Sequence, residues 1–366
     1  MSNFFSDSDL VKAPPIKRAA YSDRTAWIMA EISRLVYEPL PGEVTIKALV
    51  KEIRSAVAKG DADDIVEALV SKMIQHQSPV NVTMIDILRK ANFDFIESFA
   101  VDGTEALLAK LNLGDESSVG ADRPACAITA DREGMLILAF RGTQPSIKDV
   151  FTDVKADLVS APGGGRIHRG FLEAYQKVED QIAQTLDKYK KLPLYITGHS
   201  LGGALALVAT RYLGSDSTGA TYTYGCPRVA DDDFFLSIKT PVYRVVNAAD
   251  AVARLPFGYG LSILLTGLRL IPINGTRWIS EWIRRKIVGY THYGNLVFLS
   301  APENVVDSKG VQFEDLVVKM SPNIFWRMRV VFPRLIKTFG KAGVNDHRMN
   351  EYSQKLLAYA KLRRFQ

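Results

Sequence analysis

The sequence predicts an α/β fold built around one central, mostly parallel sheet. Beyond residue 125, short apolar runs of strand length alternate with helical stretches. This alternation is typical of a parallel sheet that carries helices on both faces. The 366 residues, 47% of them hydrophobic, would allow one large domain or two ordinary ones. We predict a single domain over residues 1–366.

The N-terminal third is predicted to be helical and shows no reactive constellation. Residues 1–20 are expected to be loosely ordered. Apolar residues over Ile28–Leu35 lie at helical spacing, and Pro39 ends this helix. Further helical patterns cover residues 43–91. We interpret this block as a helical insertion.

The α/β part has a regular order of elements. They are the strands CAITA and MLILAF, a helix over Gly170–Leu186, the strand LPLYITG, a helix over Ala204–Leu213, and the strands TYTYG and PVYRVVN. Parallel sheets place their reactive groups beyond the carboxyl ends of their strands. Candidate functional residues are therefore expected in the loops that follow these runs.

A candidate nucleophile lies in the motif GHSLGG at 198–203, between the run LPLYIT and the helix ALALVATRYL. A G-x-S-x-G turn from strand to helix pushes a strained serine out at the top of the sheet, and its glycines avoid steric clashes. The helix N-terminus that follows favours negative charge on a bound oxyanion. Ser200 is the candidate nucleophile, and an ordinary tight turn is the alternative.

A serine nucleophile needs a base, and the base needs an orienting acid. Of the five histidines, only His292 and His347 follow Ser200 at a distance, so both are candidate bases. Asp250 lies just past the strand PVYRVVN, where the orienting acid is expected.

Oxyanion donors are expected at two places. Thr143 follows the strand MLILAF, so its backbone N–H and hydroxyl could converge on an oxyanion with the N–H of Leu201. An ordinary strand-ending turn is the alternative for Thr143.

Taken together, the motifs resemble those of the class 3 lipase family, which includes the triacylglycerol lipases of filamentous fungi. The likeness covers residues 21–37 and the chain from residue 125 to the C-terminus. The matching motifs, all in the family's order, are FRGT at 140–143, IHRGF at 167–171, TGHSLGG at 197–203, YGCPRVAD at 224–231, NAADAVARLP at 247–256, THYG at 291–294, and Asp346-His347 with Tyr352.

The resemblance implies an α/β-hydrolase fold, a central, mostly parallel sheet flanked by helices. Residues 43–91 would be an inserted N-terminal helical block and residues 257–345 a cap-like, basic amphipathic insertion. Residues 143–167 match the family's lid.

The resemblance also implies the roles of the site residues. The expected catalytic residues are Ser200 as nucleophile, Asp250 as orienting acid and His347 as base, with Thr143 and Leu201 as oxyanion donors. Supporting roles are expected for His292, Asp153 and His199.

The implied activity is hydrolysis of fatty-acyl esters, triacylglycerol or related acylglycerols, through an acyl-enzyme and without metal or cofactor. A short-chain carboxylesterase and a phospholipase A1 are alternatives of the same fold, and an alcohol could replace water as acyl acceptor. A catalytically silent binding scaffold is the alternative from a different class.

Positive charge is concentrated in one segment, Leu255–Asn345. Its twelve Lys or Arg and five Asp or Glu give a net charge of +7, whereas the whole chain carries +6. The segment also holds Trp278, Trp282 and Trp326. One hypothesis is a lipid-facing cap with peripheral contact to a membrane or lipid droplet; the alternative is a cap that only covers the core. No nucleic-acid-binding motif is present, so no such partner is expected.

The sequence predicts no membrane span, because its longest apolar stretch of interest, Pro256–Leu268, is 13 residues long. The N-terminus shows no signal-peptide pattern. The default expectation is therefore a cytoplasmic location, peripheral to membrane or not, with export by another route as the alternative.

Overall fold

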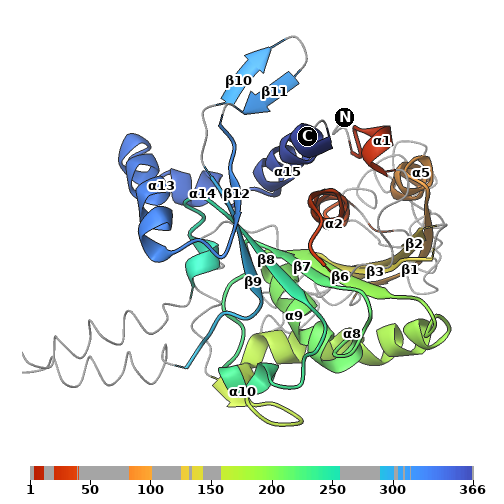
Figure 1. Cartoon of the computed structure of the whole chain (residues 1–366). Coiled ribbons are helices and arrows are strands. Elements are labelled where there is room, and N and C mark those ends of the chain that lie inside the picture. The colour runs from red at the N-terminus through yellow and green to blue at the C-terminus, as the bar shows by residue number, and fades with distance from the viewer. Residues whose placement is uncertain are drawn as a thin grey trace, which may run out of the picture.

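The structure, a computed structural model, describes residues 4–11, 20–38, 40, 82–100, 125–131, 134–142, 158–255, 289–300, 304–307, 310–313 and 315–364. Its centre is an eight-stranded sheet (Figure 1). The strands, in spatial order, are β1 (Phe93–Ala100), β2 (Ala125–Asp131), β3 (Leu136–Phe140), β6 (Leu194–His199), β7 (Thr221–Tyr224), β8 (Val242–Asn247), β9 (Asn295–Leu299) and β12 (Val318–Met320).

Strands β3, β6, β7, β8 and β9 run parallel to one another, and β1, β2 and β12 pair antiparallel at the two sides. Two small antiparallel sheets pair β4 (Leu158–Ser160) with β5 (Arg166–His168), and β10 (Asn304–Asp307) with β11 (Gly310–Phe313). The mostly parallel central sheet confirms the predicted α/β-hydrolase fold.

Helices cover both faces of this sheet (Figure 1). On one face lie α1 (Ser8–Val11), α2 (Asp23–Leu35), α5 (Val82–Lys90) and α15 (Met349–Arg364). On the other lie α8 (Arg169–Asp187), α9 (Leu201–Leu213) and α10 (Asp232–Phe235). The short helix η2 (Val252–Arg254) follows β8, and α13 (Ile324–Lys337) and α14 (Ala342–Asn345) follow β12. No helix of the described residues is long and apolar enough to cross a bilayer.

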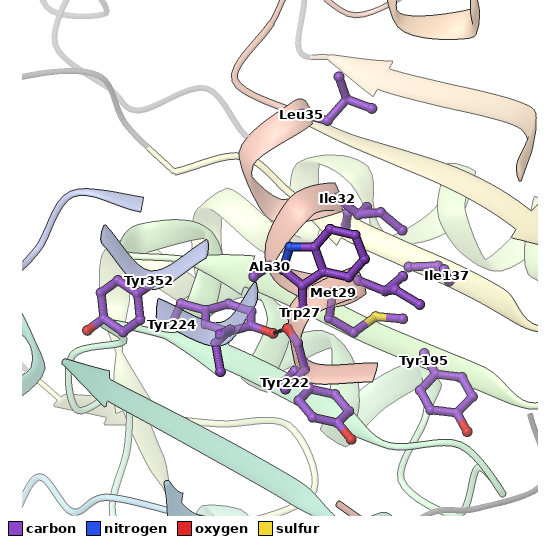
Figure 2. Packing of buried hydrophobic residues seen from close by; sticks show 14 of the residues in the cluster. Trp27, Met29, Ala30, Ile32, Leu35, Ile137, Tyr195, Tyr222, Tyr224 and Tyr352 are labelled. Atoms are coloured by element: carbon purple, nitrogen blue, oxygen red, sulfur yellow. Dashed lines mark hydrogen bonds between the residues drawn. The ribbon is translucent and has the colours of Figure 1, made fainter. Parts of the chain in front are cut away.

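Helix α2 forms much of the core beneath the functional region. Ser22 caps it by accepting a hydrogen bond from the N–H of Thr25. Trp27 is fully buried and lies among the tyrosines of the sheet, and the Tyr224 hydroxyl donates to the carbonyl of Ala26 (Figure 2). Truncation of a buried Trp to Ala typically costs about 3–5 kcal/mol. This N-terminal helix is therefore an integral part of the hydrolase core.

Two segments differ from the sequence-based expectation. Within residues 1–20, expected to be loosely ordered, α1 buries Leu10 and Val11. Residues 257–345 are not one insertion, because β9 pairs with β8 inside the central sheet and buries Val297 and Phe298. The pattern of β9, NLVFL, is an apolar run that suits a fully buried strand.

Parts of the predicted insertions lie outside the described residues. They are residues 43–81 of the helical block, 143–157 of the lid-like region and 256–288 of the basic segment. The end of the helical block is described and contains α5.

Candidate active site

Ser200 lies at the turn between β6 and α9, with φ 58° and ψ −125°. This left-handed backbone conformation is strained for a residue with a side chain. The Ser200 N–H donates to the Tyr224 carbonyl at 2.9 Å. A Cβ at Gly198 would collide with the backbone of Gly202, and one at Gly202 with the carbonyl of Phe140. The turn therefore requires the glycines of the G-x-S-x-G motif.

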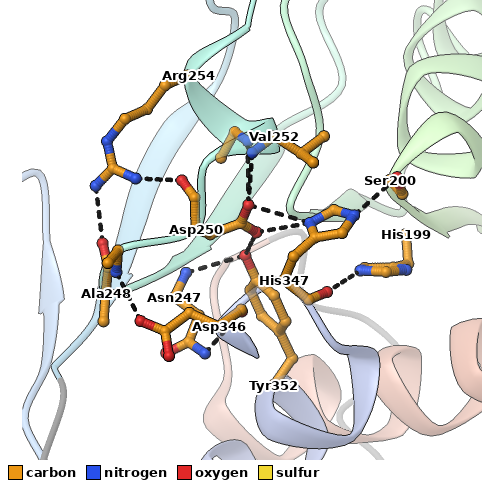
Figure 3. Close-up of polar contacts among 12 residues, drawn as sticks. His199, Ser200, Asn247, Ala248, Asp250, Val252, Arg254, Asp346, His347 and Tyr352 are labelled. Carbon is orange, nitrogen blue, oxygen red and sulfur yellow. Dashed lines mark hydrogen bonds and ion pairs between the residues drawn. The ribbon is translucent and has the colours of Figure 1, made fainter. Parts of the chain in front are cut away.

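His347 lies between Ser200 and Asp250 (Figure 3). Its Nε2 is 2.9 Å from Ser200 Oγ, and its Nδ1 is 3.1 and 3.0 Å from the two carboxylate oxygens of Asp250. All three residues are buried. An ionised carboxylate only accepts hydrogen bonds, so the His347 proton belongs on Nδ1, and Nε2 is left to accept from the Ser200 hydroxyl. The fold thus joins three distant segments in one hydrogen-bonded chain.

Asp250 is held by more than His347. Its Oδ1 accepts the backbone N–H groups of Val252 and Ala253 at 2.9 and 3.3 Å, and its Oδ2 accepts the Tyr352 hydroxyl at 2.5 Å. Burial raises the pKa of Asp250, but His347 and the Tyr352 hydrogen bond outweigh burial and bring the pKa below its ordinary value. The carboxylate is therefore ionised when it faces His347.

His199 contacts His347 from the other side. Its Nε2 lies 2.7 Å from the backbone carbonyl of His347, and its Nδ1 lies 2.9 Å from the Tyr37 hydroxyl. A carbonyl only accepts, so Nε2 carries the proton and Nδ1 accepts from Tyr37. Burial, and then the nearby His347, lower the pKa of His199 to about 3. The His199 ring is consequently neutral and acts as a fixed donor.

Asp346 links the segment of the histidine to the loop of the acid. Its Oδ2 accepts the N–H of Ala249 at 2.9 Å, and its own carbonyl accepts Asn247 Nδ2 at 2.9 Å. From α13, Arg334 Nε donates to the carboxylate oxygens at 2.9 and 2.7 Å. Asp346 itself is fully buried. This ion pair fixes the backbone next to His347 and, through Ala249, the loop that carries Asp250.

The other predicted residues fall into two groups. The Leu201 N–H opens α9 beside Ser200, where the first N–H groups of a helix have no intrahelical partner. His292 has a different partner: its ring hydrogen-bonds to the backbone of Ala253, and burial, then Arg244, lower its pKa well below the ordinary value. The structure does not bring His292 into hydrogen bonding with Ser200 or Asp250. Thr143 and Asp153 lie outside the described residues.

Three supporting side chains escaped the sequence analysis. They are Tyr37, Arg334 and Lys355, whose Nζ donates to Asn247 Oδ1 at 2.7 Å. Tyr37 and Lys355 contact partners distant in the sequence, and none of the three lies in a motif that a single sequence reveals. One signal in the sequence could have pointed to Arg334. Asp346 directly precedes the base His347, and an acid that is buried there needs a cation as its partner.

The mostly parallel sheet, the strained serine turn and the chain from Ser200 through His347 to Asp250 are the features of an α/β-hydrolase fold. The sequence model of the lipase (class 3) family matches residues 137–260, from β3 through the serine turn to the loop of the acid. The part of the chain that carries Ser200 and Asp250 is thus similar to the class 3 lipase family.

Several known lipases are similar to part of this chain. A lipase of Rhizomucor miehei is 36% identical over 156 residues, which cover 38% of this chain and 43% of that protein. The secreted mono- and diacylglycerol lipase 1 of Fusarium solani is 33% identical over 175 residues, 43% of this chain and 50% of that protein. The match thus spans about half the length of these relatives. The native Rhizomucor miehei lipase propeptide complex aligns with a TM-score of 0.41 and 23% identity over 64% of each chain.

The cytoplasmic location expected by default is wrong. The Fusarium solani relative is named a secreted lipase, which overturns this default. The default expectation rested only on the lack of a signal-peptide pattern, and proteins are also exported by routes that need no such pattern.

Proposed function

We propose that this chain is a serine ester hydrolase of the lipase type, which cleaves fatty-acyl esters of glycerol through an acyl-enzyme on Ser200. The observation that carries the proposal is the 2.9 Å contact between Ser200 Oγ and His347 Nε2, with Asp250 on the other side of the same ring. The proposed roles are nucleophile for Ser200, base for His347 and orienting acid for Asp250.

Acylation begins as Ser200 Oγ attacks the ester carbonyl carbon while its proton passes to His347 Nε2. The carbonyl oxygen becomes an oxyanion, which the Leu201 N–H stabilises, with Thr143 as the proposed second donor. Loss of one such donor typically costs roughly 3–4 kcal/mol of transition-state stabilisation. The His347 imidazolium, stabilised by Asp250, then protonates the departing alcohol, and the acyl group stays on Ser200.

Deacylation repeats the sequence with water. His347 removes a proton from a water molecule, the oxygen attacks the acyl carbon, and the same donors stabilise the second oxyanion. The imidazolium returns its proton to Ser200 Oγ as the acyl–oxygen bond breaks. The fatty acid leaves, and the serine is restored with water as the only co-substrate.

Acylglycerols are the proposed substrates. Support comes from the names of the relatives, a lipase and a mono- and diacylglycerol lipase. Because such substrates gather in membranes or droplets, the proposal includes peripheral contact with a lipid surface. His199 and His292 are proposed to support the site, and Asp153 to brace Thr143.

The test is hydrolysis of p-nitrophenyl esters from acetyl to palmitoyl, with Ser200→Ala as control. We expect activity toward long, emulsified chains and a loss of about 10⁴–10⁶-fold in kcat for Ser200→Ala. Activity confined to acetyl and butyryl esters would instead define a carboxylesterase. A folded protein that is silent across the series would support a binding scaffold.

The choice of base has its own test. His347→Ala should lower kcat as much as Ser200→Ala does, because the two residues act as one unit. His292→Ala should lower it far less, since its ring contacts neither Ser200 nor Asp250. A greater loss in His292→Ala would reverse the assignment.

A further inference from the structure

Helix α13 presents a row of large apolar side chains to solvent. The exposed residues are Ile324, Phe325, Met328, Phe332 and Ile336, followed by Phe339 just beyond the helix. Phe325 is 80% exposed, Ile336 74% and Phe339 93%. Spacings of three and four residues place the helical members on one face. A contiguous apolar row of this kind marks an interaction surface rather than scattered exposure.

The opposite face of α13 already packs on the protein. Trp326 meets Phe298 of β9 edge-to-face at 5.8 Å between ring centroids, and Lys319 of β12 lies 5.0 Å from the centre of the Trp326 ring. Val330 and Val331 pack against the same cluster. Trp326, which the lipid-facing hypothesis placed at an interface, thus faces the sheet. The fold anchors the helix on this side, so the exposed row is not needed for packing.

The charged residues of the segment that carries this row have a single sign. Residues 316–345 contain no Asp or Glu, and their Lys and Arg residues are Lys319, Arg327, Arg329, Arg334, Lys337 and Lys341. Arg329 and Lys341 are exposed. Two copies packed through this face would bring like charges together, which disfavours a self-associated pair. An anionic lipid surface accepts both the apolar row and the positive charge.

The same helix is tied to the proposed active site. Arg334, on the inner side of α13, pairs with Asp346, the residue before His347. The outer row and the catalytic segment therefore belong to one connected unit.

We propose that the outer row of α13, with Phe339, docks the protein on an anionic phospholipid membrane. The apolar side chains enter the acyl-chain boundary, and Arg329 and Lys341 lie near the head-group phosphates. This inference rests on the proposed function, because the lipid surface would supply the acylglycerol substrate. The observations that carry it are the exposed row and its charge, which are separate from those that carry the proposed function.

The experiment is co-sedimentation of the full chain with vesicles of phosphatidylcholine alone and of an equal mixture with phosphatidylglycerol. We expect binding to the mixed vesicles that weakens as salt is added, and little binding to neutral vesicles. Phe325→Glu with Phe332→Glu should lower the affinity for mixed vesicles by about 100-fold, roughly tenfold for each apolar side chain removed. Leu236→Glu is the matched control, because Leu236 is also 80% exposed but lies at the end of α10.

A second measurement separates docking from catalysis. The double variant should hydrolyse soluble p-nitrophenyl butyrate at the wild-type rate, which also shows that it is folded. Vesicle binding that is equal in the double variant and the wild type, or indifferent to phosphatidylglycerol, would overturn the docking proposal. A wild-type dimer that the double variant converts to monomer in sedimentation velocity would do the same, since the row would then be an interface between copies.

Discussion

His199 holds the backbone of His347: the Nε2–H of the residue before the serine donates to the carbonyl of the histidine that faces that serine, at 2.7 Å. Their ring centroids lie 4.6 Å apart. The neutral state of His199 suits this role, because a second buried cation beside His347 would oppose the imidazolium that the mechanism requires. His199 is therefore a positioning residue in the proposed mechanism.

Replacing His199 should affect turnover more than substrate binding. In His199→Phe the donor to His347 is lost while a planar ring remains, so the base is free to shift. A displacement of about 1 Å in a catalytic group can cost about 100-fold in rate. We expect kcat to fall by this order with KM nearly unchanged. His199→Gln, whose amide can still donate, should recover part of the loss; equal losses in both variants would speak against positioning by this hydrogen bond.

Stability should fall at acid pH because of the same residue. The pKa of His199 is about 3 in the folded chain, below the ordinary 6.5 expected after unfolding. Between these values the unfolded chain binds the extra proton, so the stabilisation present above pH 6.5 is lost as pH falls toward 3. From pH 6.5 to pH 5 this amounts to about 2 kcal/mol. Urea unfolding of the wild type and of His199→Gln at pH 7 and pH 5 should show a smaller pH effect in the variant.

The Tyr352 hydroxyl should matter to both stability and turnover. Tyr352→Phe removes a donor from the buried Asp250 carboxylate and an acceptor from the Asn247 N–H. A hydrogen bond to a charged group contributes about 1.5–3 kcal/mol. We expect the unfolding free energy to drop by about that amount and kcat by about tenfold. Tyr359→Phe, a half-buried tyrosine on the same helix, is the control and should change neither.

The features that could be predicted from the sequence were those whose signal lies within a short stretch of the chain. The strand, turn and helix around Ser200 lie within one short stretch, so the serine turn was predictable from the motif. Asp250 was predictable for the same reason, because it follows a buried strand directly. The roles predicted for Thr143 and Asp153 remain predictions.

Long-range contacts were harder to predict. Spacing alone left both His292 and His347 open, and the family resemblance favoured His347; the placement of α15 and its preceding turn brings His347 to Ser200. Strand β9 was mistaken for part of an insertion, because the basic residues around it dominated the composition. Tyr37 acts through a partner far along the chain, and Arg334 through Asp346 on a neighbouring turn, and no pattern in one sequence reveals either contact.

The Arg334–Asp346 pair should be costly to break from one side. The Asp346 side chain is fully buried and that of Arg334 is about one quarter exposed, at 26%. Arg334→Met would remove the ion-pair partner of the buried carboxylate and leave its hydrogen bond from the Ala249 N–H, and breaking a buried pair from one side costs about 3–5 kcal/mol. We expect a loss of unfolding free energy near the lower end of this range, because the partly exposed Arg334 lets water reach the pair. Arg329→Met, on the exposed part of α13, should change stability by less than about 0.5 kcal/mol.

A double variant identifies the cause of that loss. If the buried charge is responsible, Asp346→Asn added to Arg334→Met should recover part of the unfolding free energy, since the neutral amide needs no cation. Urea unfolding of the wild type, both single variants and the double variant completes the cycle. Additive losses would contradict the pairing and assign the effect to packing of the Arg334 side chain. Turnover should follow stability only partly, because Asp346 also holds the Ala249 N–H in the loop that carries Asp250.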